Sequence, residues 1–160
     1  MVAAGPESIA RGIIDSVAYM VLGSADVTGR PWTSPVWFAH EGYREFFWVS
    51  IPTSRHSRNI AARSDVSIVV FDSGVPVGEG QAVYMTGVAE RLAGTELERG
   101  IAIFGQASHG QGTREWTIDV VLPPAPYRLY RATASEQWIL APEGHPDYDL
   151  PGDNRIPVSL

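Results

Sequence analysis

The chain has 160 residues, a formal net charge of −6, no Cys and no Lys, so all 12 basic residues are Arg. Without Cys there are no disulfides, thiolate nucleophiles or Cys metal sites. Without Lys there is no P-loop lysine and no Schiff base. The negative charge argues against general binding to nucleic acids or anionic membranes. The sequence has neither an apolar run of ~18 residues nor an amino-terminal signal region, so we expect a cytoplasmic protein with no membrane partner.

The pattern of apolar residues, with 16 Gly and 12 Pro, predicts a mainly β, α+β protein that forms a single domain over residues 1–160. Short strands joined by tight turns favour a barrel or a sandwich over a parallel sheet. In the first half we expect a helix over 6–18, strands over 19–24, 31–40 and 45–51, and a second helix over 55–63. Apolar residues on both faces of the strand over 45–51 predict burial on both sides.

The second half is predicted to return to strands and to end in an irregular tail. We expect strands over 66–71 and 81–91, a helix from Glu96 to about Phe104 capped by Thr95, a flexible loop over 105–113, a short helix or turn over 115–121, and a hairpin of 127–132 with 137–140. Gly87 is expected to form a bulge or a close contact in its strand. Repeated prolines predict that the tail over 142–160 is irregular.

The start of the second helix carries the first candidate site. Ser54 or Thr53 is suited to cap its first turn. Arg55, His56 and Arg58 lie in this turn, where the helix dipole disfavours positive charge. A bound phosphate would remove the conflict, because the free N–H groups of the first turn and the dipole both favour an anion. The alternative is a capped helix with a solvated basic face.

A proline in the middle of a predicted strand marks the second candidate site. Pro35 has no N–H to give to a neighbouring strand, so it belongs at a sheet edge or a bulge. The backbone around it is then free to face a ligand, for example a flat ring with alternating donors and acceptors. The alternative is an ordinary edge strand.

Short motifs follow one another in a specific order along this part of the chain. They are Gly29-Arg30-Pro31, Ser34-Pro35-Val36-Trp37-Phe38, Phe47-Trp48-Val49-Ser50, Ser54-Arg55-His56-x-Arg58-Asn59-Ile60 and Asp65-Val66. In this order and spacing the chain resembles the pyridoxamine 5′-phosphate oxidase-like split-barrel family. The resemblance covers about residues 8–91 and, more loosely, the predicted closing hairpin.

The resemblance implies a six-stranded split β-barrel with short flanking helices, which forms a homodimer with flavin at the subunit interface. It implies that the backbone of Ser34, Pro35, Val36 and Trp37 lines the flavin ring. It also implies that Val49 and Ser50 flank the ribityl and phosphate end, and that Ser54, Arg55 and His56 hold the phosphate with support from Arg58 and Asn59.

Two positions depart from the family pattern. The family usually has Lys where this chain has His56, and a His is only partly charged near neutral pH. Phosphate affinity is therefore expected to be weaker or to depend on pH. Many members place a polar residue that contacts the ring on the strand over 81–91. The aligned position here is Ala82, so Gln81, one residue earlier, is the candidate.

The resemblance implies an FMN-dependent oxidoreductase that acts on an unknown small molecule. The alternatives are an F420-dependent reductase on the same fold and a non-catalytic flavin- or haem-binding protein. We identify no residue as a catalytic acid or base, because the cofactor itself supplies the redox chemistry. We expect no metal site, since His40, His109 and His145 are far apart in the sequence and no His-Glu-x-x-His motif is present.

Overall fold

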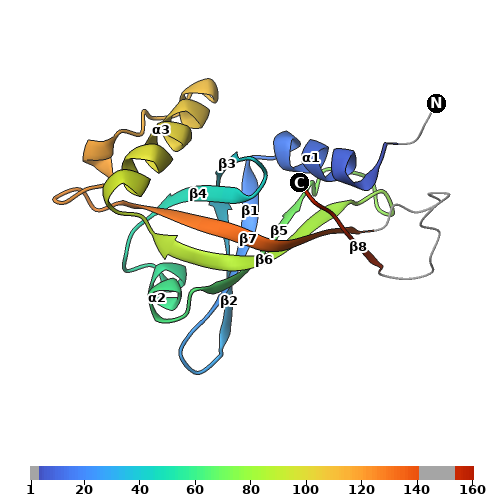
Figure 1. Ribbon diagram of the computed structural model, residues 1–160, viewed down its shortest axis with the longest axis horizontal. Helices are drawn as coiled ribbons and strands as arrows, with labels where there is room; N and C mark the ends of the chain where they lie inside the picture. The colour runs from blue at the N-terminus through green and yellow to red at the C-terminus, as the bar shows by residue number, and fades with distance from the viewer. Residues whose placement is uncertain (1–3, 141–153) are drawn as a thin grey trace.

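The computed structural model describes residues 4–140 and 154–160. Its centre is an antiparallel sheet curled into a half-barrel and flanked by short helices (Figure 1). The helices are α1 (Pro6–Ser16), α2 (Arg55–Ala62), α3 (Gly94–Gly110) and the 3-10 helix η1 (Ile118–Val120). The strands are β1 (Tyr19–Ala25), β2 (Pro31–Trp37), β3 (Ala39–Glu41), β4 (Glu45–Ser50), β5 (Asp65–Phe71), β6 (Ala82–Arg91), β7 (Arg128–Leu140) and β8 (Arg155–Pro157).

The strand order explains where the proline-containing strand lies. The sheet runs β2-β1-β5-β6-β7-β4-β3, with β8 paired to β7. β2 is therefore the strand at one end of the sheet, and Pro35 faces Val21 of β1, its one neighbour in this order. The predicted edge position of Pro35 is confirmed, and the backbone on the other side of β2 carries no ladder partner within the described residues.

Strand β4 is buried on both faces, as predicted from its apolar residues. Phe46 and Trp48 point into the main core inside the curled sheet. Phe47 points the other way, into a second cluster under α3 that includes Phe104 and Leu129. All three side chains of β4 in this run are fully buried. β4 is thus fixed by packing from both sides, which holds its last residues in a defined place.

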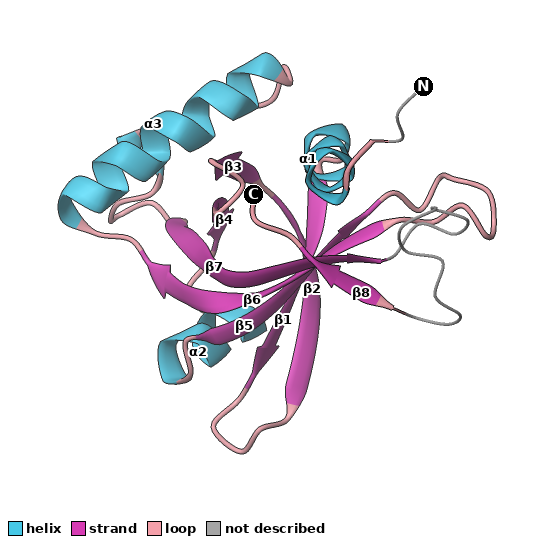
Figure 2. Ribbon diagram, turned by 45° about the vertical axis from the view of Figure 1, so that its right-hand side comes forward, coloured by secondary structure: helices cyan, strands magenta, loops and turns pink. Residues whose placement is uncertain are grey.

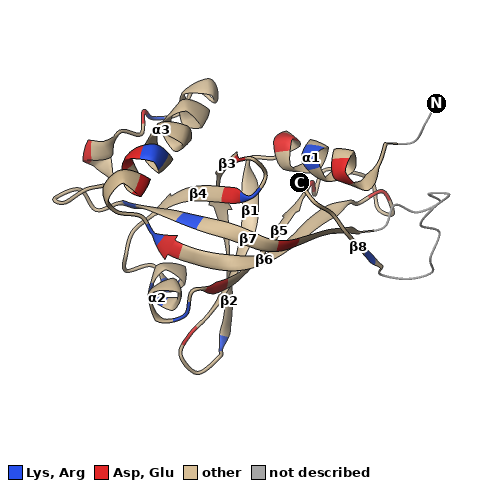
Figure 3. Ribbon diagram, viewed as in Figure 1, with Lys and Arg blue, Asp and Glu red and all other residues tan. Residues whose placement is uncertain are grey.

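The helices lie on different sides of the sheet. In both views α1 and α3 lie on one side, and α2 lies on the opposite side beside the ends of β1 and β2 (Figures 1 and 2). A network of charged residues ties α3 to the sheet, where acidic and basic residues meet near the ends of β4, β6 and β7 (Figure 3). Its ion pairs join Arg99 to Glu41, Glu45 and Glu96, and Arg131 to Glu45, Glu90 and Glu96.

The predicted closing hairpin over 127–132 and 137–140 is wrong, because residues 128–140 form the single strand β7. The residues between them stay paired with β6, and the register shifts at Gly87 to accommodate an extra residue on β7. On the other side of β7 the Ala134 N–H donates to the Arg44 carbonyl at 2.9 Å. A local sequence that resembles a turn is therefore kept extended by its neighbours. The Gly87 bulge itself is confirmed.

Helix α3 is longer than predicted and starts differently. It runs to Gly110, so the expected flexible loop over 105–113 is mostly helical, and no side chain caps its start, so the predicted Thr95 cap is wrong. Gly105 packs against the Trp116 carbonyl, where a Cβ would lie 2.6 Å from the oxygen. Ser108 is fully buried and donates its hydroxyl hydrogen to the Gly105 carbonyl. Tertiary packing thus stabilises a Gly-rich stretch as helix.

Two further predictions are corrected. The strand predicted over 31–40 divides at Phe38, whose N–H donates to the Ala18 carbonyl, and the chain then pairs with β4 as β3. The tail is not wholly irregular, because β8 pairs with the end of β7, Pro157 lying opposite Trp138. The predicted irregularity around Pro142, Pro146 and Pro151 lies outside the described residues.

Replacing Gly87 by Ala is expected to lower the free energy of unfolding by about 1–3 kcal/mol, the usual cost of overpacking. A Cβ at this position would lie 2.2 Å from the Thr133 carbonyl oxygen, which is backbone and cannot rotate away. Gly12→Ala is the matched control, because it adds the same methyl group where nothing lies within 4 Å. Because Gly12 lies within helix α1, Gly12→Ala should raise the free energy of unfolding by about 0.5–1 kcal/mol. Urea unfolding checks both variants, and equal effects would contradict the predicted clash.

Candidate functional site

Helix α2 begins at a well-formed cap. Ser54 has an extended backbone, and its Oγ accepts a hydrogen bond from the Ser57 N–H at 3.3 Å. The helix is anchored from its other face by Asn59, which is buried and whose Nδ2 donates to Ser24 Oγ of β1 at 3.1 Å. Ile60 adds an apolar contact to the main core. The predicted cap at Ser54 is confirmed, and the first turn of α2 is held at the end of β1 and β2.

A network of side-chain hydrogen bonds centres on His56. Its Nδ1 lies 3.1 Å from Ser34 Oγ of β2, and its Nε2 lies 2.8 Å from Ser50 Oγ of β4 and 3.1 Å from Ser54 Oγ. Ser54 also contacts Ser50 Oγ at 3.1 Å and donates to Ser57 Oγ at 2.8 Å. The network therefore joins β2, β4 and α2, three elements that are separate in the sequence.

His56 is a weak base in this setting. The imidazole is half-buried, and burial lowers its pKa below the ordinary value for histidine. Within the described part of the chain, no ion pair with a carboxylate compensates for this burial. His56 is thus neutral at pH 7, with one ring nitrogen able to donate and the other able to accept.

The two arginines of this turn have different surroundings. The Arg55 guanidinium stacks on the Trp32 ring, 4.3 Å from the ring centroid, and the Trp32 Nε1–H donates to Ser34 Oγ at 3.1 Å. The side chain of Arg58 is exposed and donates to the Thr53 carbonyl. Arg55 is therefore oriented by an aromatic ring beside the His56 network, whereas Arg58 is engaged with backbone in solvent.

The predicted ring-lining residues lie on β2 and alternate between two faces. Val36 is buried in the main core, and Pro35 is exposed on the other face. The Trp37 ring packs edge-on against Phe104, with centroids 4.6 Å apart, and its Nε1–H donates to Gln111 Oε1 at 3.3 Å. This end of β2 is therefore linked to α3. Of this segment, Ser34 alone joins the His56 network.

Two predicted residues from other strands are placed very differently. Val49 precedes Ser50 at the end of β4, and its side chain packs against the second cluster under α3. Gln81 lies just before β6, next to the pair formed by Phe71 and Ala82. The α2 end of β5 is Asp65, six residues from Phe71, or roughly 20 Å along a strand. Within one protomer the structure does not bring Gln81 to the His56 network.

Sequence reasoning did not identify three contributors to this arrangement. Ser57 is buried in the network, Ser24 anchors Asn59, and Trp32 supports Arg55. Two of these had a detectable signal. Ser57 is three residues after the cap, the position whose N–H a cap bonds, and Trp32 lies two residues before Ser34, so both side chains share one face of β2. Ser24 had none, because its role depends on the register between α2 and β1.

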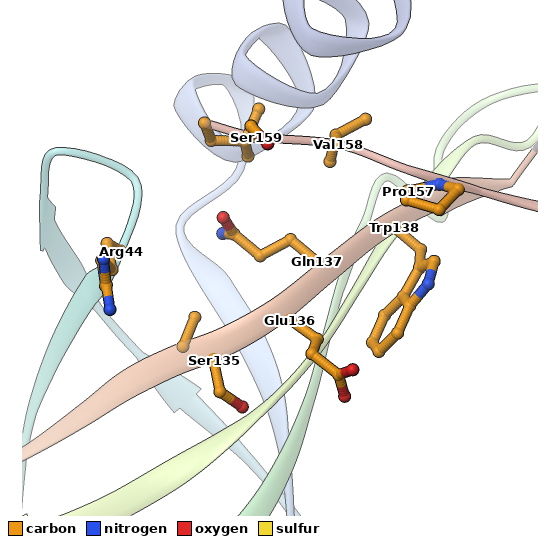
Figure 4. A pocket seen from close by; sticks show the side chains of 10 residues that line it. Arg44, Ser135, Glu136, Gln137, Trp138, Pro157, Val158 and Ser159 are labelled. Carbon is orange, nitrogen blue, oxygen red and sulfur yellow. The ribbon is translucent and has the colours of Figure 1, made fainter.

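Two hollows on the described surface lie outside this network. One, of about 620 Å³, runs across the sheet face formed by β1, β2, β5, β6 and β7, and its lining includes Ser24 and Trp32, which support the candidate site. Another, of about 400 Å³, lies between β7 and the final residues (Figure 4). Figure 4 shows Gln137 and Ser159 on one side of β7 and Glu136 and Trp138 on the other. We assign no role to this second hollow.

The residues around the first turn of α2 fit an anion. The first N–H groups of a helix have no partner within the helix and carry the positive end of its dipole. Arg55 adds a cation, and the hydroxyls of Ser50 and Ser54 and the His56 ring can turn their hydrogens toward an oxygen ligand. No acidic side chain occurs in this turn. The donor set therefore suits a phosphate group.

Acidification is expected to destabilise the protein partly through His56. Because burial lowers the folded-state pKa of His56 while the unfolded value stays near ~6.5, the unfolded chain binds this proton more readily. The contribution of neutral His56 to the free energy of unfolding is complete above pH ~6.5 and is lost as the pH falls below that value. Unfolding followed in phosphate-free buffer from about pH 5 to 8 should show a steeper slope for the native chain than for His56→Gln. Parallel curves would contradict this assignment.

Within the described residues, no helix is both long and apolar enough to cross a membrane. The same residues contain no group of three or more His, Asp or Glu side chains arranged to hold a metal ion. His40 contacts Asp15 at 3.1 Å, His109 lies in the last turn of α3, and His145 is outside the described residues.

The fold is shared with solved proteins of several kinds. A haem-binding protein from Mycobacterium smegmatis has a TM-score of 0.72 and 20% identity; the match covers 91% of this chain and only 57% of that one. HutZ, a haem storage protein from Vibrio cholerae, has a TM-score of 0.66 and 18% identity, covering 82% of this chain and 92% of the other. An F420 reductase has a TM-score of 0.60 and 17% identity, and the match covers 85% of this chain and 98% of the other.

Comparison with curated proteins gave no match. A family model described as pyridoxamine 5′-phosphate oxidase matches residues 9–121, which is more than half of the chain. The match spans the α2 turn, β2 and β4, and thus every residue of the His56 network. The split-barrel fold agrees with the expected fold class, and the chain belongs to the pyridoxamine 5′-phosphate oxidase family.

Proposed function

We propose that this protein is an oxidoreductase that binds a phosphate-tailed flavin-type cofactor, either FMN or the deazaflavin F420, at the first turn of α2. The observation that carries the proposal is the set of convergent donors there. Arg55, His56, Ser50 and Ser54 come from two elements and surround the free N–H groups of a helix start. Family membership supports a cofactor of this class, and the F420 reductase of the same fold supports the alternative.

The chain's own residues would hold and orient the cofactor. Arg55, Ser50 and Ser54 would donate to the phosphate, and Asn59 would keep α2 in place against β1. The unpaired backbone edge of β2 near Pro35 would face the ring. When bound, the cofactor itself supplies hydride transfer. A small-molecule substrate would then meet the exposed side of the ring.

Cofactor binding is tested directly by titrating the purified protein with FMN and with F420 in separate experiments. Quenching or a shift of the cofactor fluorescence that saturates at one equivalent per chain supports the proposal. Reduction of the bound cofactor by a nicotinamide nucleotide, or oxidation of reduced F420 in the presence of an acceptor, then establishes redox activity. If neither cofactor binds at micromolar protein concentration, the proposal is wrong.

The rival function is a non-catalytic carrier or sensor that binds flavin or haem on the same barrel. The names of the Mycobacterium smegmatis and Vibrio cholerae proteins motivate it, although their low identity shows a shared fold alone. Two measurements separate the functions. A haem carrier gives a Soret band on adding haem, and a flavin carrier binds its ligand without turnover.

We also propose that two copies associate through the face of the sheet away from the main core, with the cofactor between them. Tyr19, Phe71 and Val88 are exposed on strands β1, β5 and β6, with 62%, 43% and 52% of their surface accessible. Aromatic and apolar side chains gathered on a sheet face are typical of protein interfaces. Light scattering should give the mass of a dimer, and a monomer at tens of micromolar would refute this part.

A further inference from the structure

The proposed cofactor site has few positive charges in its interior. Arg55, half-buried beside Trp32, supplies one cation, and Arg58 is exposed and engaged with the Thr53 carbonyl. His56 occupies the centre but is surrounded by hydroxyl groups and has no carboxylate partner among the described residues. The remaining donors are neutral hydroxyls and backbone N–H groups. The site is thus rich in hydrogen-bond donors and poor in charge.

The two kinds of cofactor tail differ in charge at the phosphate. The terminal monoester of FMN carries about −1.5 to −2 at pH 7, because its second pKa is near ~6. The phosphate of F420 is a diester, which has no second proton to lose and carries one negative charge. Desolvation of an ion rises with the square of its charge, whereas attraction to a fixed cation rises only in proportion. A site with one interior cation therefore suits the single charge better.

We propose that the α2 site selects a cofactor whose phosphate is a singly charged diester over one with a doubly charged monoester, and that His56 sets this preference. The inference rests on the proposed function and, of the two cofactors proposed there, favours F420, whose phosphate is a diester. His56 acts as a neutral donor and acceptor held by Ser34 and Ser50. A permanent cation at this position would offset the second charge of a monoester, and the hydroxyl network offers none.

The surroundings of His56 offer little to change its charge. Charged and titratable residues on α2, at its end and on the strands around it are Arg55, Arg58, Arg63, Tyr19 of β1, Glu45 of β4, and Tyr84, Glu90 and Arg91 of β6. Glu45 and Glu90 pair with arginines of the α3 network. No ion pair joins any of these residues to His56. Burial lowers the pKa of His56, so it stays neutral at and above pH 7.

The sharpest test uses two ligands that differ by one charge, FMN and its 5′-phosphate methyl ester. Fluorescence titration of the native protein at pH 8 should show the methyl ester binding at least about fivefold more tightly, because the second charge of FMN must be desolvated without a second cation to offset it. Toward pH 6 the monoester loses its second charge, so the two affinities should converge. F420 is the third ligand, and it should also bind the native protein at pH 8.

Variants of His56 test its role separately from the rest of the site. His56→Lys should reverse the preference at pH 8 and favour FMN, and Val77→Lys is the matched control. Val77 is fully exposed in the loop after β5, at the end opposite α2, so the same added charge there should leave the ratio unchanged. His56→Gln keeps a neutral hydrogen-bonding side chain, so it should keep the preference at pH 8.

The possible results separate the inference from the proposed function. If FMN binds to the native protein as tightly as its methyl ester at pH 8, the inference is wrong and the cofactor site stands. If His56→Lys folds and leaves the ratio unchanged, His56 does not set the preference. If His56→Lys does not fold, His56→Gln supplies the test. Retained preference for the methyl ester at pH 8 supports the inference, and loss of that preference overturns it. If none of the three ligands binds, the proposed function and the inference fall together.

Discussion

Arg55→Ala should weaken cofactor binding by about 1.5–3 kcal/mol, or roughly tenfold to 150-fold in Kd, the range for a hydrogen bond to a charged group. The Arg55 guanidinium is oriented by the Trp32 ring, which itself donates to Ser34 Oγ of the His56 network. Orientation reduces the entropy lost when the side chain binds a phosphate. Titration calorimetry with the cofactor that binds the native protein measures the change.

Arg44→Ala is the control for this prediction. Arg44 is an exposed arginine that precedes β4, whereas the network contacts Ser50 at the other end of that strand. Both variants remove one positive charge from the same chain, so a general electrostatic effect would appear in both. An unchanged Kd for Arg55→Ala, or equal losses in the two variants, would contradict the proposed phosphate anchor.

Trp48→Ala is expected to lower the free energy of unfolding by about 3–5 kcal/mol, the usual cost of removing a large aromatic side chain from a core. Trp48 is fully buried at the centre of the main cluster and stacks on Tyr130, with ring centroids 5.7 Å apart and planes at 15°. The cavity would open two residues before Ser50, so cofactor binding should weaken as well. Denaturant unfolding gives the stability, and titration gives the affinity.

Trp48→Phe distinguishes packing from hydrogen bonding at this position. The indole Nε1 is buried without a hydrogen-bond partner among the described residues. A buried donor without a partner costs about 1–3 kcal/mol, so its removal should offset part of the lost ring volume. We expect Trp48→Phe to remain within about 1.5 kcal/mol of the native chain. A loss as large as that of Trp48→Ala would show that the indole itself is required.

Several elements could be predicted because their signals are local. The cap at Ser54, the edge position of Pro35 and the bulge at Gly87 each follow from the chemistry of one residue type. The burial of β4 on both faces follows from its continuous apolar run. The family resemblance also rested on a local stretch, from Gly29 to Val66, where the order of short motifs is dense.

Errors arose where a local signal conflicted with distant neighbours. The stretch Thr133–Glu136 has weak strand character, yet pairing with β6 keeps β7 continuous across it. The Gly-rich end of α3 has low intrinsic helix propensity, yet the contact of Gly105 with the Trp116 carbonyl holds it helical. Neither partner could be located before the sheet register was known.

The sequence by itself determined which residues gather at the start of α2 and what charge they carry: two Arg, a His and two Ser, with no acid between Glu45 and Asp65. Only the tertiary structure decided how these residues are used. It brought Ser34 of β2 and Ser50 of β4 to the two ring nitrogens of His56 and turned Arg58 toward the Thr53 carbonyl. The physical reason is that charge and propensity belong to single residues, whereas burial and hydrogen-bond partners depend on how separate strands come together.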